Sequence, residues 1–559
     1  MCRGDNNHSK GGSHMKRKPK AIISLLLAVL MMATVLAGCG GTASSTPSQS
    51  TAASSASGSS AGDDSAGPIE FPYTGEEVVF KGFGYDGLAQ EDTVVSRAWQ
   101  EHIGNIKVEY EFIPYNDFLT KMDIYLASGD IPDILPVYDP KTVVNTYGAS
   151  GALLDFNQYI DYMPNLQEYR KTYPNMDYLN TAEGNRYAIV GVQPIDYAGE
   201  SWFVNMDELK KAGVEKAPET VDELLAAMRA VKEKDSAVTP FLSYWNISYA
   251  MGAFANLINA QTSAVYYDTE DDTYKFAYNE ESSKRKELIQ LMADMYAEGL
   301  VNREIATLSD EQAKALLAQG QWAFTYLYGN SLEKEVFKVD RGEELPFDIQ
   351  PMTPPAASDG KRYLSIAYQH DNVPGWGIVC SSQTEHPELL AAYMDQVVSP
   401  FGRDIFNYGV EGVTYDIVDG KPVMKEGIDK AEMGVSTQYE VWMVGMGPNE
   451  RNGDGYLLSQ ASIDLSTENF NSGNVEAVWP PVHTLFSTEA GEQKANIENT
   501  LKTYVDEQEA MFIYGQRSMS EWDAFVEEVN NLIDVQELLN LYNNAETILR
   551  DSPRVFQAS

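Results

Sequence analysis

The stretch IKVEYEFIPYNDFLTKMDIYLASGDIPDILPV, residues 106–137, decides the fold. Its first part, 106–112, alternates apolar and polar side chains, which is the pattern of a strand with one buried face. The sequence around 115–128 then predicts a helix, and the short apolar run at 133–137 predicts a second strand. Strand, helix and strand therefore follow one another without a long connection.

The elements before this stretch extend the alternation. Val78, Val79 and Phe80 are strand-like, and residues 93–104 predict a helix. The resulting order βαβαβ predicts a mainly parallel sheet in an α/β fold. In open sheets of this kind, ligands bind beyond the carboxyl ends of the strands.

Similar elements recur further along the chain. A strand at 201–205 runs into a short helix that begins at Asp207 and stops at Gly213. Thr220, with Glu223 three residues later, forms a capping box and predicts the start of another helix.

The later segments predict a hairpin and then more helices. Two strand-like segments, 265–267 and 274–278, flank the acidic turn 268–272. A helix at 282–298 closes with Gly299, and the chain from Glu492 onward is mostly helical in pattern.

The amino terminus predicts export. Residues 1–14 are treated as an extension outside the fold, and 15–38 combine a basic start with an apolar run that is too short for the roughly 20 residues of a membrane helix. Leu36, Ala37, Gly38 and Cys39 resemble the lipobox of bacterial lipoproteins. That resemblance implies a lipid-anchored protein whose first mature residue is an acylated Cys39, although an ordinary secretory signal is the alternative.

A polar tether follows the anchor. Residues 39–68 comprise Cys39 and a segment made almost entirely of Ser, Ala, Thr, Gly and Gln. Such a composition buries too little apolar surface to offset the entropy of ordering, so we expect a flexible linker. It would hold the folded part on the order of 30 Å from the extracellular face of the cell membrane.

Composition restricts the class of ligand. Hydrophobic residues make up 43% of the 559 residues, so the body is globular and large enough for two or more lobes. The formal net charge is −41, which disfavours nucleic acid, anionic lipid and polyanionic ligands. Of the three cysteines, only Cys380 lies in the globular part, and we expect an inert buried thiol there.

Several segments together resemble the extracellular solute-binding proteins of ABC importers, in particular the large lipoproteins that serve carbohydrate uptake. They occur in order between about 76 and 545, and their order and spacing are more specific than any one of them. The segments are 127–134 (ASGDIPDI), 204–213 (VNMDELKKAG), 320–324 (GQWAF), 407–415 (NYGVEGVTY), 503–507 (TYVDE) and 519–529.

The resemblance implies a two-lobe periplasmic-binding-protein-like fold, of class α/β, with a hinge, a central cleft and a helical C-terminal region. It implies a solute-binding domain at 69–559, with one lobe at about 69–197 and 374–412 and the other at 198–373 and 413–559. The expected function is capture of a neutral oligosaccharide and its delivery to ABC permease subunits. We expect a monomer that has no cofactor and is attached to the membrane through lipid only.

Candidate ligand contacts follow two of the predicted strands. Sugars need flat apolar faces and planar polar groups, which aromatic rings, carboxylates and amides supply. Tyr85 and Asp86 follow the first strand, and Tyr138 and Asp139 follow the third. The alternative is that both tyrosines are half-buried loop residues and both aspartates cap helices.

Other candidates share an aromatic ring or an amide in a segment that could line the cleft. Trp202 would face the cleft or the core according to its orientation in its strand. Tyr328 follows the strand that begins near Gly320, at a place the family uses for ligand, whereas Trp322 is expected in the core. The full set of further candidates is Trp202, Tyr244, Trp245, Asn246, Tyr328, Trp376 and Trp442.

Alternative functions have weaker support. A peptide or another small solute remains an alternative ligand. A secreted glycoside hydrolase would need two carboxyls at one bond, but 82 Asp and Glu residues make such pairs unavoidable. No nucleophile elbow, zinc-protease or phosphate-loop motif occurs in the globular part, and the calcium-like run 452–455 fails at Glu450 and Ala461. We therefore expect neither an enzyme nor a metal site.

Overall fold

The computed structural model describes most of the second of the chain's two compact units, which spans 65–559. The described residues are 68–85, 93–190, 201–244, 247–305, 307–327, 331–339, 344–365, 376–425, 464–465, 468–469, 472–478 and 482–549. The predicted signal segment, Cys39 and nearly all of the linker lie outside them. None of the helices in the described ranges is both long and apolar enough to cross a membrane.

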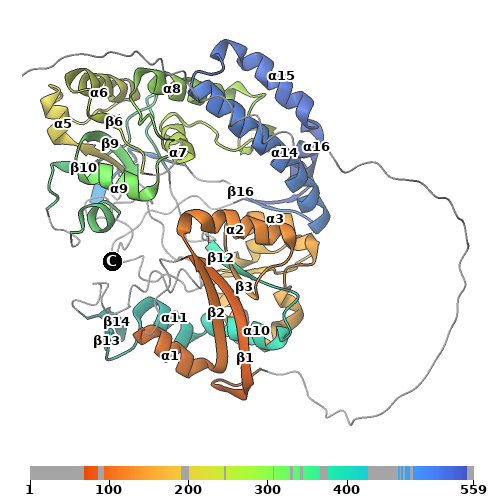
Figure 1. The fold of residues 1–559 in the computed structure, drawn as a ribbon. Helices are drawn as coiled ribbons and strands as arrows, with labels where there is room; N and C mark the ends of the chain where they lie inside the picture. Colours follow the sequence, from red (N-terminus) through yellow and green to blue (C-terminus); the bar gives the residue numbers. More distant parts are fainter. Residues whose placement is uncertain are drawn as a thin grey trace, which may run out of the picture. The chain divides into compact units, whose positions relative to one another are not determined.

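The first lobe is built on a five-stranded sheet with the order β2-β1-β3-β12-β4 (Figure 1). β2 and β3 are parallel to β1, whereas β12 is antiparallel to β3 and β4 is antiparallel to β12. β4 therefore runs in the same direction as β1, β2 and β3, and only β12 is reversed, so the prediction of a mainly parallel sheet is confirmed. The strands are β1 (Tyr73–Tyr85), β2 (Gly104–Ile113), β3 (Ile134–Tyr138), β4 (Ala188–Ile189) and β12 (Trp376–Cys380).

Apolar side chains cover both faces of this sheet. Ile378 belongs to one buried cluster with Phe80, and the next residue, Val379, belongs to another with Phe83, because successive side chains of a strand point to opposite faces. Cys380 is buried, as predicted. The helices of the lobe are α1 (Val94–Ile103), α2 (Tyr115–Ser128), α3 (Pro140–Tyr147), α4 (Pro164–Thr172), α10 (Pro387–Val397) and α11 (Pro400–Tyr408).

Local sequence sets the helix ends in this lobe. Thr93 caps α1, since its hydroxyl accepts from the backbone N–H of Ser96 at 3.0 Å while the Ser96 hydroxyl accepts from the Thr93 N–H at 2.8 Å. Gly129 ends α2 with φ 71°, a left-handed conformation that glycine adopts without steric cost. Both predicted helices are confirmed.

The second lobe is built on a four-stranded sheet with the order β10-β5-β9-β6. β5 is antiparallel to both of its neighbours, and β6 is parallel to β9. The strands are β5 (Ser201–Asn205), β6 (Thr239–Phe241), β9 (Trp322–Leu327) and β10 (Ile349–Met352), and the helices are α5 (Met206–Lys211), α6 (Val221–Lys234), α7 (Ile247–Ile258), α8 (Arg285–Glu298) and α9 (Asp310–Ala318).

One predicted helix start differs in detail. The Thr220 hydroxyl accepts from the Glu223 N–H at 3.2 Å, as a cap should. The Glu223 carboxylate, however, accepts from the N–H of Glu219, not from that of Thr220, at 2.8 Å. The predicted hairpin forms as antiparallel β7 (Val265–Asp268) and β8 (Thr273–Phe276).

The C-terminal region packs on the second lobe. Val505, Phe512 and Phe525 belong to the same buried cluster as Trp202 and Phe241. The predicted helices are confirmed, and a two-stranded antiparallel sheet that the sequence did not suggest accompanies them. The elements are α14 (Thr488–Ile513), α15 (Trp522–Leu532), α16 (Val535–Asn543), β16 (Val482–Leu485) and β17 (Glu546–Leu549), drawn in blue in Figure 1.

Asp395 of α10 joins two helices of the first lobe. Its carboxylate is fully buried and accepts from the backbone N–H of Leu166 at 2.7 Å and from the side chain of Asn165 at 2.7 Å. The N-cap residue of α4, Met163, supplies no side-chain hydrogen bond, so Asp395 satisfies the first turn of α4 from another helix. Burial raises the pKa of Asp395 to about 6 from its ordinary 3.8, although hydrogen bonds from Leu166 and Asn165 oppose the rise.

We predict a pH-dependent stability that Asp395→Asn removes. Because the folded-state pKa is raised, the folded protein binds more protons between about pH 4 and pH 6. The contribution of Asp395 to stability is therefore full below this window and falls as the pH rises through it, by up to about 3 kcal/mol. Urea titrations at several pH values measure this, and a difference between wild type and variant that does not change with pH would contradict it.

Candidate binding site

The strands of the first sheet bring several predicted residues to one edge. β1, β2 and β3 end there, with Tyr85 level with Ile113 in the register of β1 and β2. β12 begins at the same edge, where the backbone of Trp376 lies opposite that of Tyr138. The backbone thus places Tyr85 and Tyr138 at one edge, as the parallel order predicted, and the antiparallel strand β12 adds Trp376 there. Asp86 lies outside the described residues.

Tyr138 is the exposed end of an otherwise buried strand. Residues 134–137 of β3 are buried, whereas 53% of Tyr138 is exposed. Its backbone N–H donates to Met122 Sδ of α2 at 3.4 Å. The fold therefore holds the backbone of an exposed phenol ring in place, and such a ring offers a flat apolar face and a polar tip.

Asp139 follows directly and caps α3. Its backbone has φ 49°, in the left-handed region, and its carboxylate accepts from the N–H of Thr142 at 3.2 Å and from the Thr142 hydroxyl at 2.7 Å. The alternative reading, in which Asp139 caps a helix, is confirmed. An ionised carboxylate has about four lone-pair sites, so the exposed Asp139 can accept further hydrogen bonds while it caps α3.

A nearby cation does not neutralise this edge. Lys141 lies two residues after Asp139, but its Nζ donates to the carbonyl oxygen of Tyr178 at 2.5 Å. Burial lowers the pKa of Lys141 to about 7, against the attraction of Asp139, and Lys494 adds to the lowering. Near neutral pH, only a fraction of the protein molecules therefore carry a charged Lys141. Asp139 is exposed at the start of α3.

The second sheet gathers a further set of predicted residues at one edge. β6 and β9 run parallel and end at Phe241 and Leu327, and β5 begins opposite Leu327 at Ser201. Tyr244 follows β6 closely at this edge. Four further candidates lie outside the described residues: Trp245, Asn246, Tyr328 and Trp442.

Two predicted ligand contacts lie in the core instead. Trp202 is 1% exposed, and its ring centroid lies 5.4 Å from that of Phe254 and 5.5 Å from that of Tyr326. All five residues of β5 are buried because the sheet is covered on both faces. Tyr244 is 2% exposed and packs in the cluster that contains Trp322, which was expected in the core. The core alternative therefore holds for Trp202, and the prediction of Tyr244 as a ligand contact is corrected to a core residue.

The structure adds Ser243, a residue that the sequence pattern did not indicate. This residue is fully buried two positions after β6 ends, and its hydroxyl has no hydrogen-bond partner among the described residues. Buried hydroxyls nearly always have a partner, so Ser243 marks a polar position beside the second edge. A single serine has no sequence signal that distinguishes it from other buried serines.

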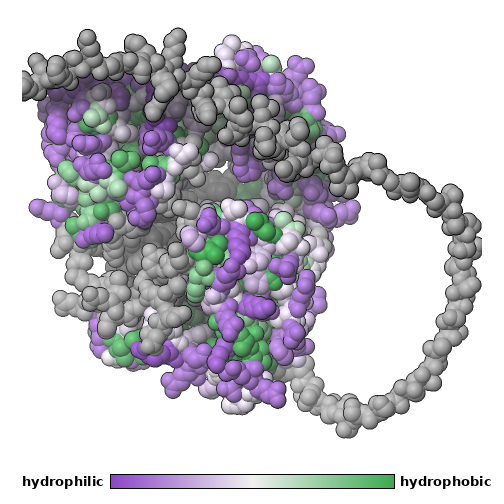
Figure 2. Space-filling view, viewed as in Figure 1, coloured by the Kyte–Doolittle hydropathy of each residue, from purple (hydrophilic) through white to green (hydrophobic). Residues whose placement is uncertain are grey.

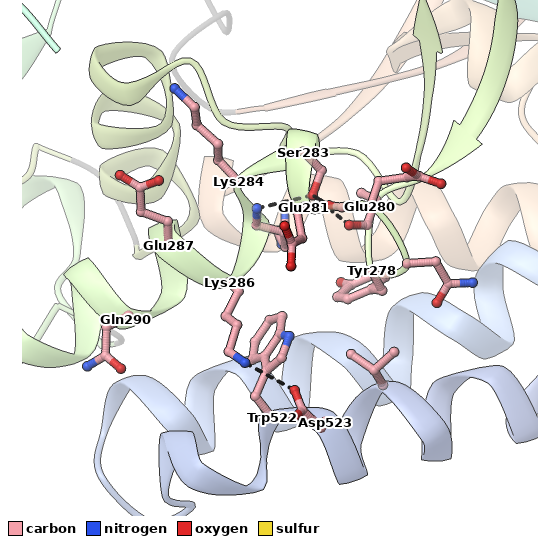
Figure 3. A pocket seen from close by; sticks show the side chains of 14 residues that line it. Tyr278, Glu280, Glu281, Ser283, Lys284, Lys286, Glu287, Gln290, Trp522 and Asp523 are labelled. Carbon is pink, nitrogen blue, oxygen red and sulfur yellow. Dashed lines mark hydrogen bonds and ion pairs between the residues drawn. The ribbon is translucent and has the colours of Figure 1, made fainter. Parts of the chain in front are cut away.

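A separate hollow of about 790 Å³ lies between the start of α8 and α15 (Figure 3). Its basic residues already have partners, since Lys286 pairs with Asp523 at 3.1 Å and Lys284 donates to the carbonyl of Ile258 at 2.7 Å. None of the predicted contacts lines this hollow. In the described parts of the chain, no three His, Cys, Asp or Glu side chains are grouped to hold a metal ion.

Comparison with known proteins places this geometry in context. Residues 73–402 match the family described as bacterial extracellular solute-binding protein. The polygalacturonan/rhamnogalacturonan-binding protein YtcQ of Bacillus subtilis is 22% identical over 90% of this chain and 95% of its own.

Two solved structures share the fold. The alginate-binding protein AlgQ2 has a TM-score of 0.68 at 22% identity, over 84% of this chain and 98% of its own. FusA of S. pneumoniae in complex with kestose has a TM-score of 0.63 at 16% identity, over 83% of this chain and 98% of its own. This likeness confirms the predicted fold class.

The two aromatic candidates Trp202 and Tyr138 differ in burial, so their substitution should affect stability to different extents. Trp202→Ala should lower the free energy of unfolding by about 3–5 kcal/mol, because it leaves a cavity in a packed core. Tyr138→Ala should change it by no more than about 0.5 kcal/mol, because the ring is largely exposed. Urea titration of both variants measures this, and equal losses would show that Tyr138 is a packing residue.

Proposed function

Because the chain belongs to the bacterial extracellular solute-binding proteins, we propose that it captures a neutral oligosaccharide outside the cell and delivers it to the permease subunits of an ABC importer. One observation carries the choice of ligand. An exposed tyrosine ring, Tyr138, stands beside an exposed carboxylate, Asp139, at the edge where three parallel strands end.

The chemistry of this pair suits a sugar. The C–H face of a pyranose or furanose ring packs on an aromatic ring, and a carboxylate accepts hydrogen bonds from sugar hydroxyls. The fixed backbone of α3 positions Asp139, so little conformational entropy is lost there on binding. We extend the site, as proposals, to Tyr85, Asp86, Trp376, Trp245, Asn246, Tyr328 and Trp442.

The charge of the edge favours a neutral sugar over a uronate. The names of two relatives refer to acidic polymers, polygalacturonan for YtcQ and alginate for AlgQ2, whereas FusA is in complex with the neutral kestose. In this chain Asp139 would face a uronate carboxylate, and Lys141 is bonded to the protein. Hydrophilic side chains cover much of the coloured surface in Figure 2, and the whole chain carries a formal net charge of −41.

We further propose that the protein binds its ligand without altering it. The relatives reported above are named as binding proteins, and the globular sequence has none of the common hydrolase motifs. The exposed pair of Tyr138 and Asp139 at the sheet edge suits recognition of a ligand. Recognition alone needs no general acid or nucleophile.

The proposed organisation follows from the two sheets and the export signal. Strands from 73–189 and 376–380 form one sheet and strands from 201–352 form the other, which supports lobes at about 69–197 with 374–412 and at 198–373 with 413–559. The sequence around Cys39 supports a lipid anchor on the extracellular face of the membrane. In this arrangement the protein acts as a monomer tethered near its permease.

Two substitutions at the edge test the ligand class. Tyr138→Ala should weaken kestose binding about tenfold, because the stacked apolar surface is lost. Asp139→Asn should weaken it about fivefold, because a charge-assisted hydrogen bond becomes a neutral one. Asn still caps helices and tolerates the left-handed conformation, so α3 should stay intact. Isothermal titration calorimetry with kestose, raffinose and trigalacturonate measures these effects.

The matched control is Ile124→Ala, which removes an exposed apolar side chain from α2 of the same lobe and should leave binding unchanged. If the ligand is a uronate, Asp139→Asn should instead tighten the binding of trigalacturonate, because a repulsive charge is removed. That result would overturn the neutral-sugar proposal. Unchanged affinity for every sugar in Tyr138→Ala would remove this edge from the site.

A further inference from the structure

The start of α14 rests on the first lobe. The carbonyl of Phe486 accepts from the N–H of Ala182 at 3.0 Å. Thr488, the first residue of α14, donates its N–H to both carboxylate oxygens of Glu183 at 3.2 Å and its hydroxyl to one of them at 3.1 Å. The negative charge of Glu183 therefore lies at the positive end of the helix dipole.

The ionised form of Glu183 suits this contact. Burial alone would raise the pKa of Glu183, but hydrogen bonds from its own backbone, from Thr181 and from Thr488 bring it below its ordinary value. The carboxylate is therefore charged at neutral pH, and it joins two segments that lie 305 residues apart in the sequence.

One turn later, α14 touches α3 through glycine. A methyl group at Gly491 would lie 2.4 Å from the backbone carbonyl oxygen of Asn145, closer than any real contact. Any other residue would push α14 away from α3. Gly491 is also buried, so the two backbones meet directly.

The rest of α14 belongs to the second lobe. Glu509 accepts from Arg285 Nε at 2.7 Å and from Arg285 Nη2 at 2.6 Å, and the Tyr278 hydroxyl donates to the same carboxylate at 3.0 Å. This pair is buried, and separating its members would leave an uncompensated charge in the core. Leu501 and Val505 pack in the second-lobe core, so this part of α14 moves with that lobe.

We propose that the first turn of α14 is the pivot between the lobes, and that Gly491 and Glu183 set the balance between their open and closed arrangements. A continuous helix fixed to one lobe transmits any rotation to its contact with the other. Here that contact combines Gly491 against the carbonyl of Asn145 with the Glu183 carboxylate at the helix end. The Phe486–Ala182 hydrogen bond and the stacked rings of His483 and Tyr178 lie just before it in the chain. Because apparent affinity scales with the fraction of binding-competent protein, the pivot also tunes sugar affinity, a step that rests on the proposed function.

Two glycine variants test the pivot. Gly491→Ala places a methyl against α3, whereas Gly252→Ala in α7 is the matched control, since nothing lies within 4 Å of a methyl group there. Small-angle X-ray scattering of the ligand-free protein should show a changed radius of gyration for Gly491→Ala only. Titration calorimetry should show its dissociation constant for kestose changed by at least about threefold.

Glu183→Gln keeps the shape of the side chain and an acceptor for Thr488 but removes the charge, so it tests the pivot even if Gly491→Ala fails to fold. We expect its dissociation constant for kestose to change by about twofold to fivefold, with a shift in the radius of gyration. Folded variants with wild-type scattering and wild-type affinity would overturn the pivot. Failure of wild type to bind kestose or raffinose would count against the proposed ligand, while the scattering comparison would still decide the pivot.

Discussion

Three neighbouring strands that run in the same direction, β2, β1 and β3, impose the constraint on which the candidate site depends. Parallel strands cannot be joined by tight turns, so each connection carries a helix back over the sheet and every strand ends at the same edge. That edge collects Tyr85, Tyr138 and Asp139 from distant parts of the sequence. The antiparallel strand β12 adds the start of its own backbone there, at Trp376.

The C-terminal region depends on a different kind of contact. α14 packs its apolar side into the core of the second lobe and secures it with the buried pair of Arg285 and Glu509. At its other end, it meets the first lobe at Glu183 and, through Gly491, at α3. A helix that is fixed in one lobe and presses its first turn against the other is suited to the proposed pivot.

Local signals explain what could be predicted from the sequence. The capping residues Thr93 and Thr220 and the left-handed Gly129 act within a few residues, so helix ends were correctly placed. The sequence did not show whether Trp202 faces the core or the cleft. β5 is buried on both faces, and such a strand lacks an alternation of apolar and polar residues. The pairing of β16 with β17 and of Glu183 with Thr488 depends on tertiary contacts that no local pattern encodes.

We propose above all that the protein binds a neutral oligosaccharide and releases it chemically unaltered. The most direct measurement is urea unfolding in the presence of the tightest-binding neutral oligosaccharide at about 100 times its dissociation constant, followed by chromatography of the recovered sugar. We expect the free energy of unfolding to rise by about 2.7 kcal/mol and the sugar to be recovered intact. Cleaved sugar, or saturating sugar without any gain in stability, would contradict it.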